Sequence, residues 1–365
     1  MGSAFFVRWL AAVLGALAAV VGAAQELPTF LERLPAERLD VAPPASRVRG
    51  EPGRFAVAQR ECRAEPAPDV RRRIVDLVVQ EWAFFGFPVF DERDPASWVR
   101  RRRQAELEAL LESPERLREI LEERAREAAR VAPSIAGYWA VTAEGGWIVE
   151  RHNADWRAAG GLVTRWRDAW SAAFISWVMC EAGLGNPERF QRAIAHHTYI
   201  DQAIRARDGR APEAVLVAYE VGEQPIVPGD LVCLARRPAY RTLEDRRRQI
   251  GVGARTHCDF VVKVDEEREV LLAIGGNVRG TVGLKLLPAE RRGAGPLRPV
   301  DRSSVPGAAT TFVHLKLRAE PIEANAFDRS ATVAAMTCAS AAPAPAHVTA
   351  VGLFEPASSS LPTAC

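Results

Sequence analysis

Neither sign of charge is in excess in this chain of 365 residues: 48 Lys and Arg side chains are balanced by 46 Asp and Glu, which leaves a formal net charge of +2. The basic residues are interleaved with acidic ones, so the chain has no overall field that would attract nucleic acid. Lysine is nearly absent, with only Lys263, Lys285 and Lys316, and this bias towards arginine indicates codon usage more than function. Hydrophobic residues make up 48% of the chain, which excludes a wholly disordered protein.

Long apolar runs are missing beyond the N-terminal region, and no later segment is long and apolar enough to span a bilayer. Residues Met1 to Ala24 combine a short n-region containing Arg8, an apolar run from Trp9 to Val21, and small residues before Gln25. This pattern predicts a signal peptide over residues 1–24. An uncleaved anchor is the alternative, but the apolar run is shorter than the roughly 20 residues of a spanning helix. We therefore expect a periplasmic or secreted protein with no membrane span after signal cleavage.

The six cysteines include no CxxC pair, and their spacing matches no zinc-binding pattern. Their even number and the expected export permit disulfides. Cys180 and Cys233 lie in strongly apolar runs and are predicted to be small buried hydrophobic residues. Cys62, Cys338 and Cys365 lie in segments expected to be loosely ordered, and a Cys338–Cys365 disulfide is one pairing that the sequence leaves open.

Three segments follow the predicted signal peptide. Residues 25–69 are rich in Pro, Arg and Glu, which predicts an irregular leader. Residues 70–318 show helical periodicity and then short apolar runs, which predicts one α+β domain with N-terminal helices packed on a small antiparallel sheet. Residues 319–365 are rich in Ala, Pro and Ser, which is typical of a disordered tail.

Within the domain, helical patterns come first and strand-like runs come later. Apolar residues recur at spacings of three and four, and the capping pair Ser113-Pro114 divides one long Arg/Glu-rich pattern into two helices. The predicted helices span residues 70–85, 97–112, 114–131, 134–142, 170–183 and 190–206. The predicted strands span residues 215–219, 231–234, 259–264, 270–274 and 311–317. This order is typical of an α+β fold rather than of alternating βαβ units.

Reactive residue types are concentrated in four short motifs where the predicted helices meet the predicted strands. Ser171 stands at the start of a predicted helix, where the helix dipole favours a nucleophile and the free backbone N–H groups could stabilise an oxyanion. Alternatively, Ser171 serves only as the N-cap of this helix. His257 begins a predicted strand and is either the general base or a surface histidine. Asn277 ends the neighbouring strand, either to orient the imidazole or as a turn residue. The motifs are WSAAFISW (170–177), PGDL (228–231), HCDFVV (257–262) and GGNV (275–278).

Three residues beside these motifs have assigned roles. Asp259 lies two residues after His257 on the same strand face, so it is an alternative partner for the base. Cys258 points to the opposite face, which excludes it as a substitute nucleophile. Asp230 is expected to hold the Pro-Gly turn by accepting from backbone N–H groups, with a place in a substrate groove as the alternative.

Trp170 and His197 are further candidates for lining a substrate groove, although Trp170 also fits a core position. His196 and His197 together could line the groove or have a structural role in their helix, and with His257 and Asp259 they could also act as ligands of a metal. Adjacent helical residues point about 100 degrees apart, so at most one of this pair would join such a site. No metal and no cofactor is therefore expected.

The order of the four motifs resembles the NlpC/P60 and CHAP groups of papain-like cell-wall hydrolases, and most of all the DUF2272 family. Relatives of this kind carry a Trp-Cys-Ala-Ala-Phe-Val-Ser-Trp helix, a Pro-Gly-Asp turn, a His-led strand and a Gly-Gly-Asn strand end. The resemblance covers roughly Val70 to Pro288 and includes Glu81-Trp82 and Tyr138-Trp139. It implies a papain-like, NlpC/P60-type core.

By position, the resemblance makes Ser171 the nucleophile in place of the family's Cys, His257 the general base and Asn277 the orienting residue. A serine hydroxyl has a far higher pKa than a thiol, so the base must take its proton during the attack. The resemblance therefore implies an exported amide hydrolase that acts on the peptide part of peptidoglycan. A catalytically inactive cell-wall or protein-binding module on the same fold is the alternative, and a scaffold that binds protein through its Arg/Glu-rich helices is a third.

Overall fold

The computed structural model describes residues 32–94, 113–160, 166–235, 240–302 and 309–341, together with residues 104, 107 and 108. By internal contacts, residues Phe30–Met336 form one compact unit, and the terminal segments Met1–Thr29 and Thr337–Cys365 are grouped separately. The predicted signal peptide and Cys365 lie outside the described residues. No helix in the described ranges is long and apolar enough to cross a membrane.

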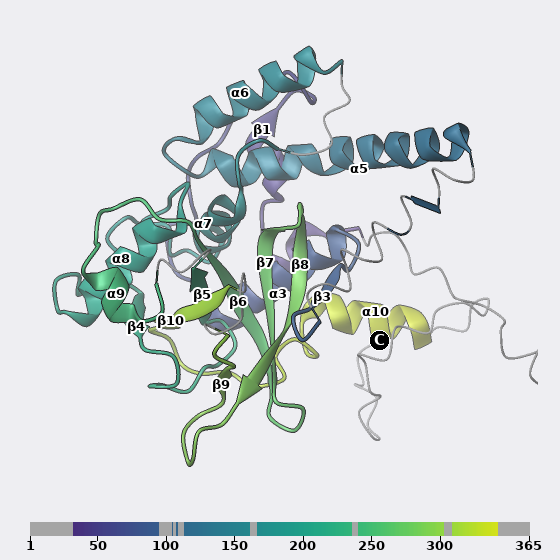
Figure 1. The fold of residues 1–365 in the computed structure, drawn as a ribbon. Helices are drawn as coiled ribbons and strands as arrows, with labels where there is room; N and C mark the ends of the chain where they lie inside the picture. Colours follow the sequence, from purple (N-terminus) through teal and green to yellow (C-terminus); the bar gives the residue numbers. More distant parts are fainter. Residues whose placement is uncertain are drawn as a thin grey trace, which may run out of the picture. The chain divides into compact units, whose positions relative to one another are not determined.

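A mixed sheet is the main element of the Phe30–Met336 unit (Figure 1). Its neighbouring strands are antiparallel except at one edge, where β3 pairs in parallel with β8. The predicted α+β class is confirmed, but the sheet is larger than expected and is not purely antiparallel. In spatial order the strands are β3 (Val89–Asp91), β8 (Thr281–Glu290), β7 (Val270–Val278), β6 (Thr256–Asp265), β5 (Leu231–Ala235), β10 (Thr310–Leu317) and β4 (Leu216–Tyr219), and β9 (Arg298–Pro299) pairs with β8.

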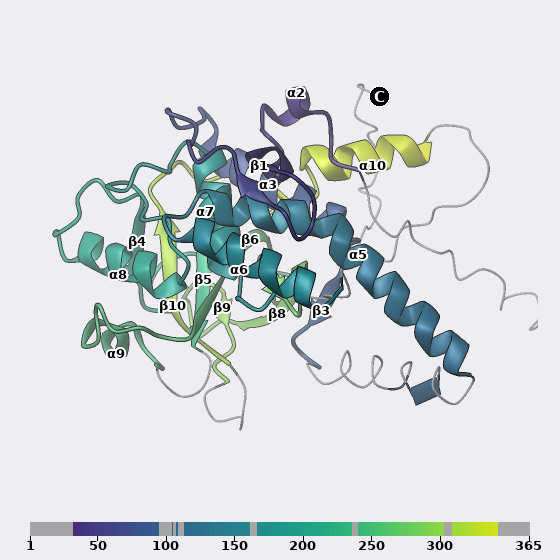
Figure 2. The same cartoon turned by 90° about the horizontal axis from the view of Figure 1, so that it is seen from above.

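Helices cover the central strands (Figures 1 and 2). α3 (Val70–Phe84) and α7 (Ser171–Glu181) pack against β6 and β7, and α8 (His196–Arg207) packs against β4 and β6. α5 (Pro114–Ala140) packs on α7 and on α6 (Gly145–Ala158). The shorter elements are α2 (Ala36–Leu39), the 3₁₀ helix η1 (Pro44–Arg47), β1 (Val48–Arg49), β2 (Ala56–Val57), α9 (Leu243–Arg247) and α10 (Ala331–Ala341).

α5 is one continuous helix where the sequence pattern predicts two. It begins as expected, because the hydroxyl of Ser113 accepts the backbone N–H three residues later and a proline occupies the first turn. Pro133 does not end it, although proline removes a helical hydrogen bond. The last turns are buried, and Gly137 lies so close to η1 that an added Cβ would come within 1.8 Å of the carbonyl oxygen of Pro44. Tertiary packing therefore keeps the helix intact beyond the proline.

The strands around the candidate site are longer than predicted. β6 begins at Thr256, so His257 lies inside the strand rather than at its mouth. β7 continues to Val278 and includes the whole Gly-Gly-Asn motif. β8 was not predicted, and its inward residues Val282 and Leu284 belong to the core.

α8 is shorter than predicted, since it begins at His196 rather than at residue 190. Ser176 of α7 explains the difference. Its Oγ accepts the backbone N–H of Ala193 at 3.0 Å and donates to the carbonyl oxygen of the same residue at 3.2 Å. This pair of bonds ties the segment before α8 to α7, so His196 becomes the first helical residue.

The predicted leader and tail both contain ordered structure. In the leader, Arg47 is buried, and its guanidinium forms an ion pair with Glu181 at the end of α7. In the segment predicted to be a disordered tail, Phe327 and Val333 are buried and α10 forms. Compositional bias misses these contacts because a few anchoring side chains are enough to order a polar segment.

Two disulfides correct the interpretation of the cysteines. Cys180 is bonded to Cys62, which joins the leader to α7, and Cys233 is bonded to Cys258 across the paired strands β5 and β6. Cys180 and Cys233 are fully buried as predicted, but as half-cystines. The proposed partner of Cys338, Cys365, lies outside the described residues.

Candidate functional site

Ser171 is the first residue of α7, and Trp170 occupies the N-cap position. The simple N-cap role considered for Ser171 is therefore wrong. The residue is 6% exposed, and its side-chain Oγ lies 2.6 Å from Nε2 of His196. Since the N–H groups of a first helical turn have no partner within the helix, the hydroxyl lies beside donors that could stabilise an oxyanion.

The ring of His196 is also oriented by a hydrogen bond at its second nitrogen, Nδ1. Its Nδ1 forms a short hydrogen bond with the hydroxyl of Tyr199, one turn further along α8. Burial, together with the negative charge of Asp259, raises the pKa of Tyr199 well above its usual value, so the phenol stays neutral. A neutral His196 that donates from Nδ1 to the phenol oxygen presents an unprotonated Nε2 to Ser171. This tautomer makes His196 a proton acceptor for the Ser171 hydroxyl.

A second imidazole, that of His257, forms a hydrogen bond with the carboxylate on its own strand. Nε2 of His257 lies 2.8 Å from Oδ1 of Asp259, as expected for residues i and i+2 on one strand face. The other oxygen of Asp259, Oδ2, accepts from Nζ of Lys285 on β8 at 2.8 Å. All three side chains are buried. Burial opposes ionisation of Asp259, but the electrostatic and hydrogen-bond interactions with His257 and with the Lys285 ammonium group hold the pKa of this carboxyl well below its usual range.

The two imidazoles meet edge to face, with ring centroids 5.2 Å apart. Four elements thus contribute to one buried polar cluster: α7 with Ser171, α8 with His196, β6 with His257 and β8 with Lys285. A hydroxyl, two imidazoles, a carboxylate and an ammonium group in this arrangement can move protons to and from a serine.

Two glycines of β7 make room for this cluster. A Cβ on Gly275 would come within 1.9 Å of Oδ1 of Asp259 and 3.2 Å of Nε2 of His257. A Cβ on Gly276 would come within 2.5 Å of the Cβ of Phe174 on α7. The Gly-Gly pair therefore lets β7 pass directly beneath the His–Asp pair and the first turns of α7.

Of the two residues expected to orient His257, the structure brings Asp259 into contact with it. Asn277 is half-buried and has a φ of 55°, the left-handed conformation that Asn tolerates better than most residues. The left-handed geometry expected for Asn277 is present, but the residue lies within β7, where the pairing with β8 is irregular, rather than in a turn. Nε2 of His257 is already directed to Asp259, so Asn277 is not needed at that nitrogen.

The three residues proposed for a substrate groove lie in different surroundings. Trp170 is buried and stacks against Tyr138, in a core position. His197 is partly buried, and its Nδ1 lies 3.5 Å from the backbone nitrogen of Ala254. Burial, followed by the charge of nearby Arg246, lowers the pKa of His197.

Asp230 holds its turn, as the structural interpretation of the PGD motif predicted. It is fully buried, and its Oδ2 accepts the backbone N–H of Val227 at 3.1 Å. It is also paired with Arg71 at 2.7 Å and lies 2.9 Å from Nε2 of His314. These contacts join β5, α3 and β10, and they leave Asp230 without access to a groove.

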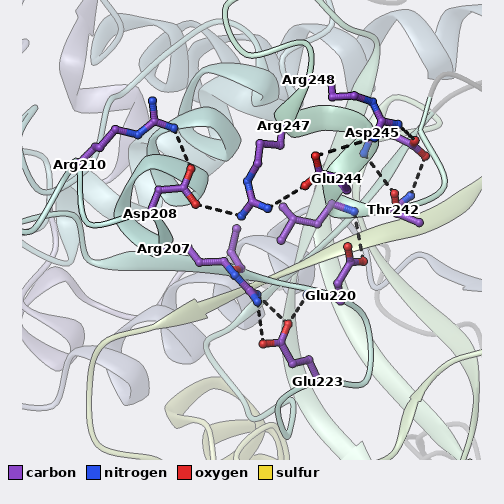
Figure 3. A network of polar contacts seen from close by, with 12 residues as sticks. Arg207, Asp208, Arg210, Glu220, Glu223, Thr242, Glu244, Asp245, Arg247 and Arg248 are labelled. Carbon is purple, nitrogen blue, oxygen red and sulfur yellow. Dashed lines mark hydrogen bonds and ion pairs between the residues drawn. The ribbon is translucent and has the colours of Figure 1, made fainter.

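Ion pairs link α8 to α9, which lies in the segment before β6. Arg246 of α9 forms a buried, two-bond ion pair with Asp201 of α8, at 2.7 and 2.6 Å. An exposed network joins the same two elements, for example through Arg247 and Asp208 at 3.0 Å (Figure 3). Exposed pairs contribute about 0–1 kcal/mol each, whereas loss of one partner of a buried pair costs about 3–5 kcal/mol. The buried pair is thus the main attachment, and it fixes the helix that carries His196.

Sequence patterns did not identify three residues of the cluster, namely His196 as the partner of Ser171, Tyr199 and Lys285. The sequence indicated a groove-lining, structural or metal-binding role for His196 but not that of a base, although the i, i+3 spacing of His196 and Tyr199 places them on one helix face. Lys285 is one of three lysines in an arginine-rich chain and interrupts an apolar run, which is the signal that could have marked it. Among the described residues, no group of three or more His, Cys, Asp or Glu side chains has an arrangement suited to a metal ion.

Comparison with known proteins places this site within a family. No curated protein and no solved structure matches the chain. A family model described as an uncharacterized protein conserved in bacteria (DUF2272) matches residues 128–315, just over half of the chain. The matched range runs from within α5 to within β10 and contains Ser171, His196, His257 and Lys285. The chain therefore belongs to the DUF2272 family.

Proposed function

We propose that this protein is an exported serine hydrolase that cleaves amide bonds in the peptide part of peptidoglycan. The observation that carries the proposal is the 2.6 Å contact between Oγ of Ser171 and Nε2 of His196 at the N-terminus of α7. A hydroxyl paired with an imidazole, which is itself oriented by a third group, has the arrangement of an activated nucleophile.

In the proposed reaction, Ser171 Oγ attacks the amide carbonyl carbon while its proton passes to Nε2 of His196. Nδ1–H of His196 remains bonded to the neutral phenol of Tyr199, which fixes the ring during this transfer. Backbone N–H groups of the first turn of α7 stabilise the tetrahedral oxyanion. The C–N bond then breaks, and His196 returns the proton to the leaving amine. A water molecule hydrolyses the ester on Ser171 by the same steps and restores the hydroxyl.

The assignment of the base has an alternative in His257, which the family resemblance favours. Asp259 orients His257 through Nε2, so Nδ1 is the nitrogen that would accept a proton in that case. The contact to Ser171 favours His196, and the two assignments predict different effects of substitution.

The substrate and the compartment rest on separate arguments. The motif order resembles NlpC/P60 and CHAP cell-wall hydrolases, and a papain-like core of that type is part of the proposal. The expected signal peptide and the two disulfides favour an oxidising, extracytoplasmic location, where peptidoglycan lies.

The second candidate is a cell-wall binding module that has lost catalysis. The observation in its favour is the low exposure of Ser171, a residue that is only 6% exposed. A serine in place of cysteine would then mark a retained site in which no bond is broken.

Digestion of purified peptidoglycan tests these alternatives. We expect release of new muropeptides by the wild-type protein, and loss of that release in Ser171→Ala and in His196→Gln. His197→Gln is the matched control, because the adjacent histidine lies outside the cluster, and it should retain activity. Loss in His257→Gln with full activity in His196→Gln would transfer the role of base to His257. Activity that appears only in Ser171→Cys would overturn the serine hydrolase in favour of the binding module.

A further inference from the structure

Lys285 occupies an unusual position for a charged residue. It lies in β8 between β3 and β7, opposite Ala273 on one side and Phe90 on the other. Its side chain is only 8% exposed. Buried lysines are rare unless they are paired, and Lys285 is paired with Asp259 at 2.8 Å. In a chain whose cations are nearly all arginine, this is one of three lysines.

The positive charge of Lys285 determines the net charge of the buried cluster. The charged and titratable groups near His257 include Asp259 on its own strand, Lys285 on β8 and His196 on α8, and Tyr199 of α8 interacts electrostatically with Asp259. Tyr199 is neutral, so the ionised carboxylate and the ammonium group cancel. A proton on His257 would then leave a net positive charge in a buried site, which is unfavourable. Without Lys285, the same carboxylate would stabilise a protonated His257 as its ion-pair partner.

We propose that Lys285 is a positioning residue of the site, which neutralises Asp259 so that His257 remains an uncharged imidazole protonated on Nε2. The ammonium group of Lys285 contacts Oδ2 of Asp259, whereas the ring of His257, which faces His196, contacts Oδ1.

The catalytic consequence of this assignment rests on the proposed function. His196 must become positively charged when it takes the proton of Ser171, and a charged His257 with its ring centroid 5.2 Å away would oppose this step. If His257 is the base instead, it must itself be neutral to accept the proton. Lys285 serves the reaction in either case.

The test is a ¹⁵N NMR titration of the histidine side chains in the full chain, with the signals of His257 identified from their loss in His257→Gln. In the wild-type protein at pH 7, we expect His257 to show the pattern of a neutral ring with its proton on Nε2. In Lys285→Met, we expect the titration midpoint of His257 to rise by about one pH unit or more, which is a tenfold gain in proton affinity. Lys285→Arg keeps the charge and should restore the wild-type midpoint.

Lys263→Met is the matched control, because it removes a lysine whose ion pair with Asp328, at 2.7 Å, lies outside the cluster. The midpoint of His257 should not move in this variant. An imidazolium pattern for His257 in the wild type at pH 7 would overturn the proposal, and this measurement stands even if Lys285→Met does not fold. Equal midpoints in the wild type and in a folded Lys285→Met would overturn it as well.

The titration is independent of enzymatic activity, so the two proposals can fail separately. If His257 titrates as expected but no muropeptides are released, the charge assignment holds and the hydrolase is refuted. If muropeptides are released, the acid limb of the kcat/KM–pH profile should move up in Lys285→Met and stay in place in Lys263→Met.

Discussion

His152 provides a quantitative test of the packing around the loop that leads into Ser171. It lies on α6, is 4% exposed, and stacks on Trp166 with ring centroids 3.6 Å apart and an interplanar angle of 7°. Within the part of the chain that the structure describes, neither of its ring nitrogens has a hydrogen-bond partner. Burial, only partly offset by the charges of Asp155 and Asp168, lowers the pKa of His152 to about 4.

The expected effect on stability follows from the sign of this shift. Between pH 6.5 and about 4, the unfolded chain binds a proton at His152 and the native protein does not, so the free energy of unfolding falls as the pH falls. This interval spans about 2.5 pH units, and at about 1.36 kcal/mol per unit the loss amounts to about 3 kcal/mol. Below pH 4 both states bind the proton and the contribution stays constant.

The assay is denaturant unfolding at several pH values between 4 and 7, for the wild type and for His152→Phe, which keeps an aromatic ring on Trp166 without a titrating group. Carboxylates contribute equally to both proteins, so the difference isolates His152. We expect His152→Phe to gain about 3 kcal/mol relative to the wild type between pH 7 and pH 4. His197→Phe is the comparison, because its partly exposed ring should give a smaller gain. A constant difference between wild type and His152→Phe across this range would refute the reasoning.

Two further predictions concern the cluster itself. Gly275→Ala should lower muropeptide release at least tenfold and destabilise the protein by about 1–3 kcal/mol, because the new Cβ would collide with Asp259. Gly253→Ala is the control, because a Cβ added there meets nothing within 4 Å. This variant should change neither muropeptide release nor the thermal unfolding midpoint. Tyr199→Phe should lower kcat about threefold to tenfold with little change in KM, since it removes one hydrogen bond that orients His196. A raised KM with unchanged kcat would show that Tyr199 acts on substrate binding instead.

Local patterns predicted the helices and strands whose signals are contained within the element itself. α3 and α7 follow their apolar spacing closely, and β6 contains the predicted alternation that places His257 and Asp259 on one face. β8 escaped prediction because Gly, Lys and Pro interrupt its apolar residues. Only its pairing with β7 and β3 makes it a strand.

The contacts of the site could not be predicted in the same way. Ser171 and His196 are 25 positions apart, and their contact depends on how the segment between α7 and α8 is tied down through Ser176. Asp259 and Lys285 are 26 positions apart and meet only because β7 lies between their strands and carries a glycine at the crossing point. The disulfide between Cys62 and Cys180 spans 118 positions and has no local signal at all.

The sequence by itself determined the α+β class, the position of Ser171 at the start of a helix and the shared strand face of His257 and Asp259. Each depends on backbone periodicity, which acts over a few neighbouring residues. The tertiary structure alone decided that Ser171 contacts His196 and that Lys285 balances the charge of Asp259. Such contacts depend on which faces pack together across the sheet, and many distant side chains decide that packing at once.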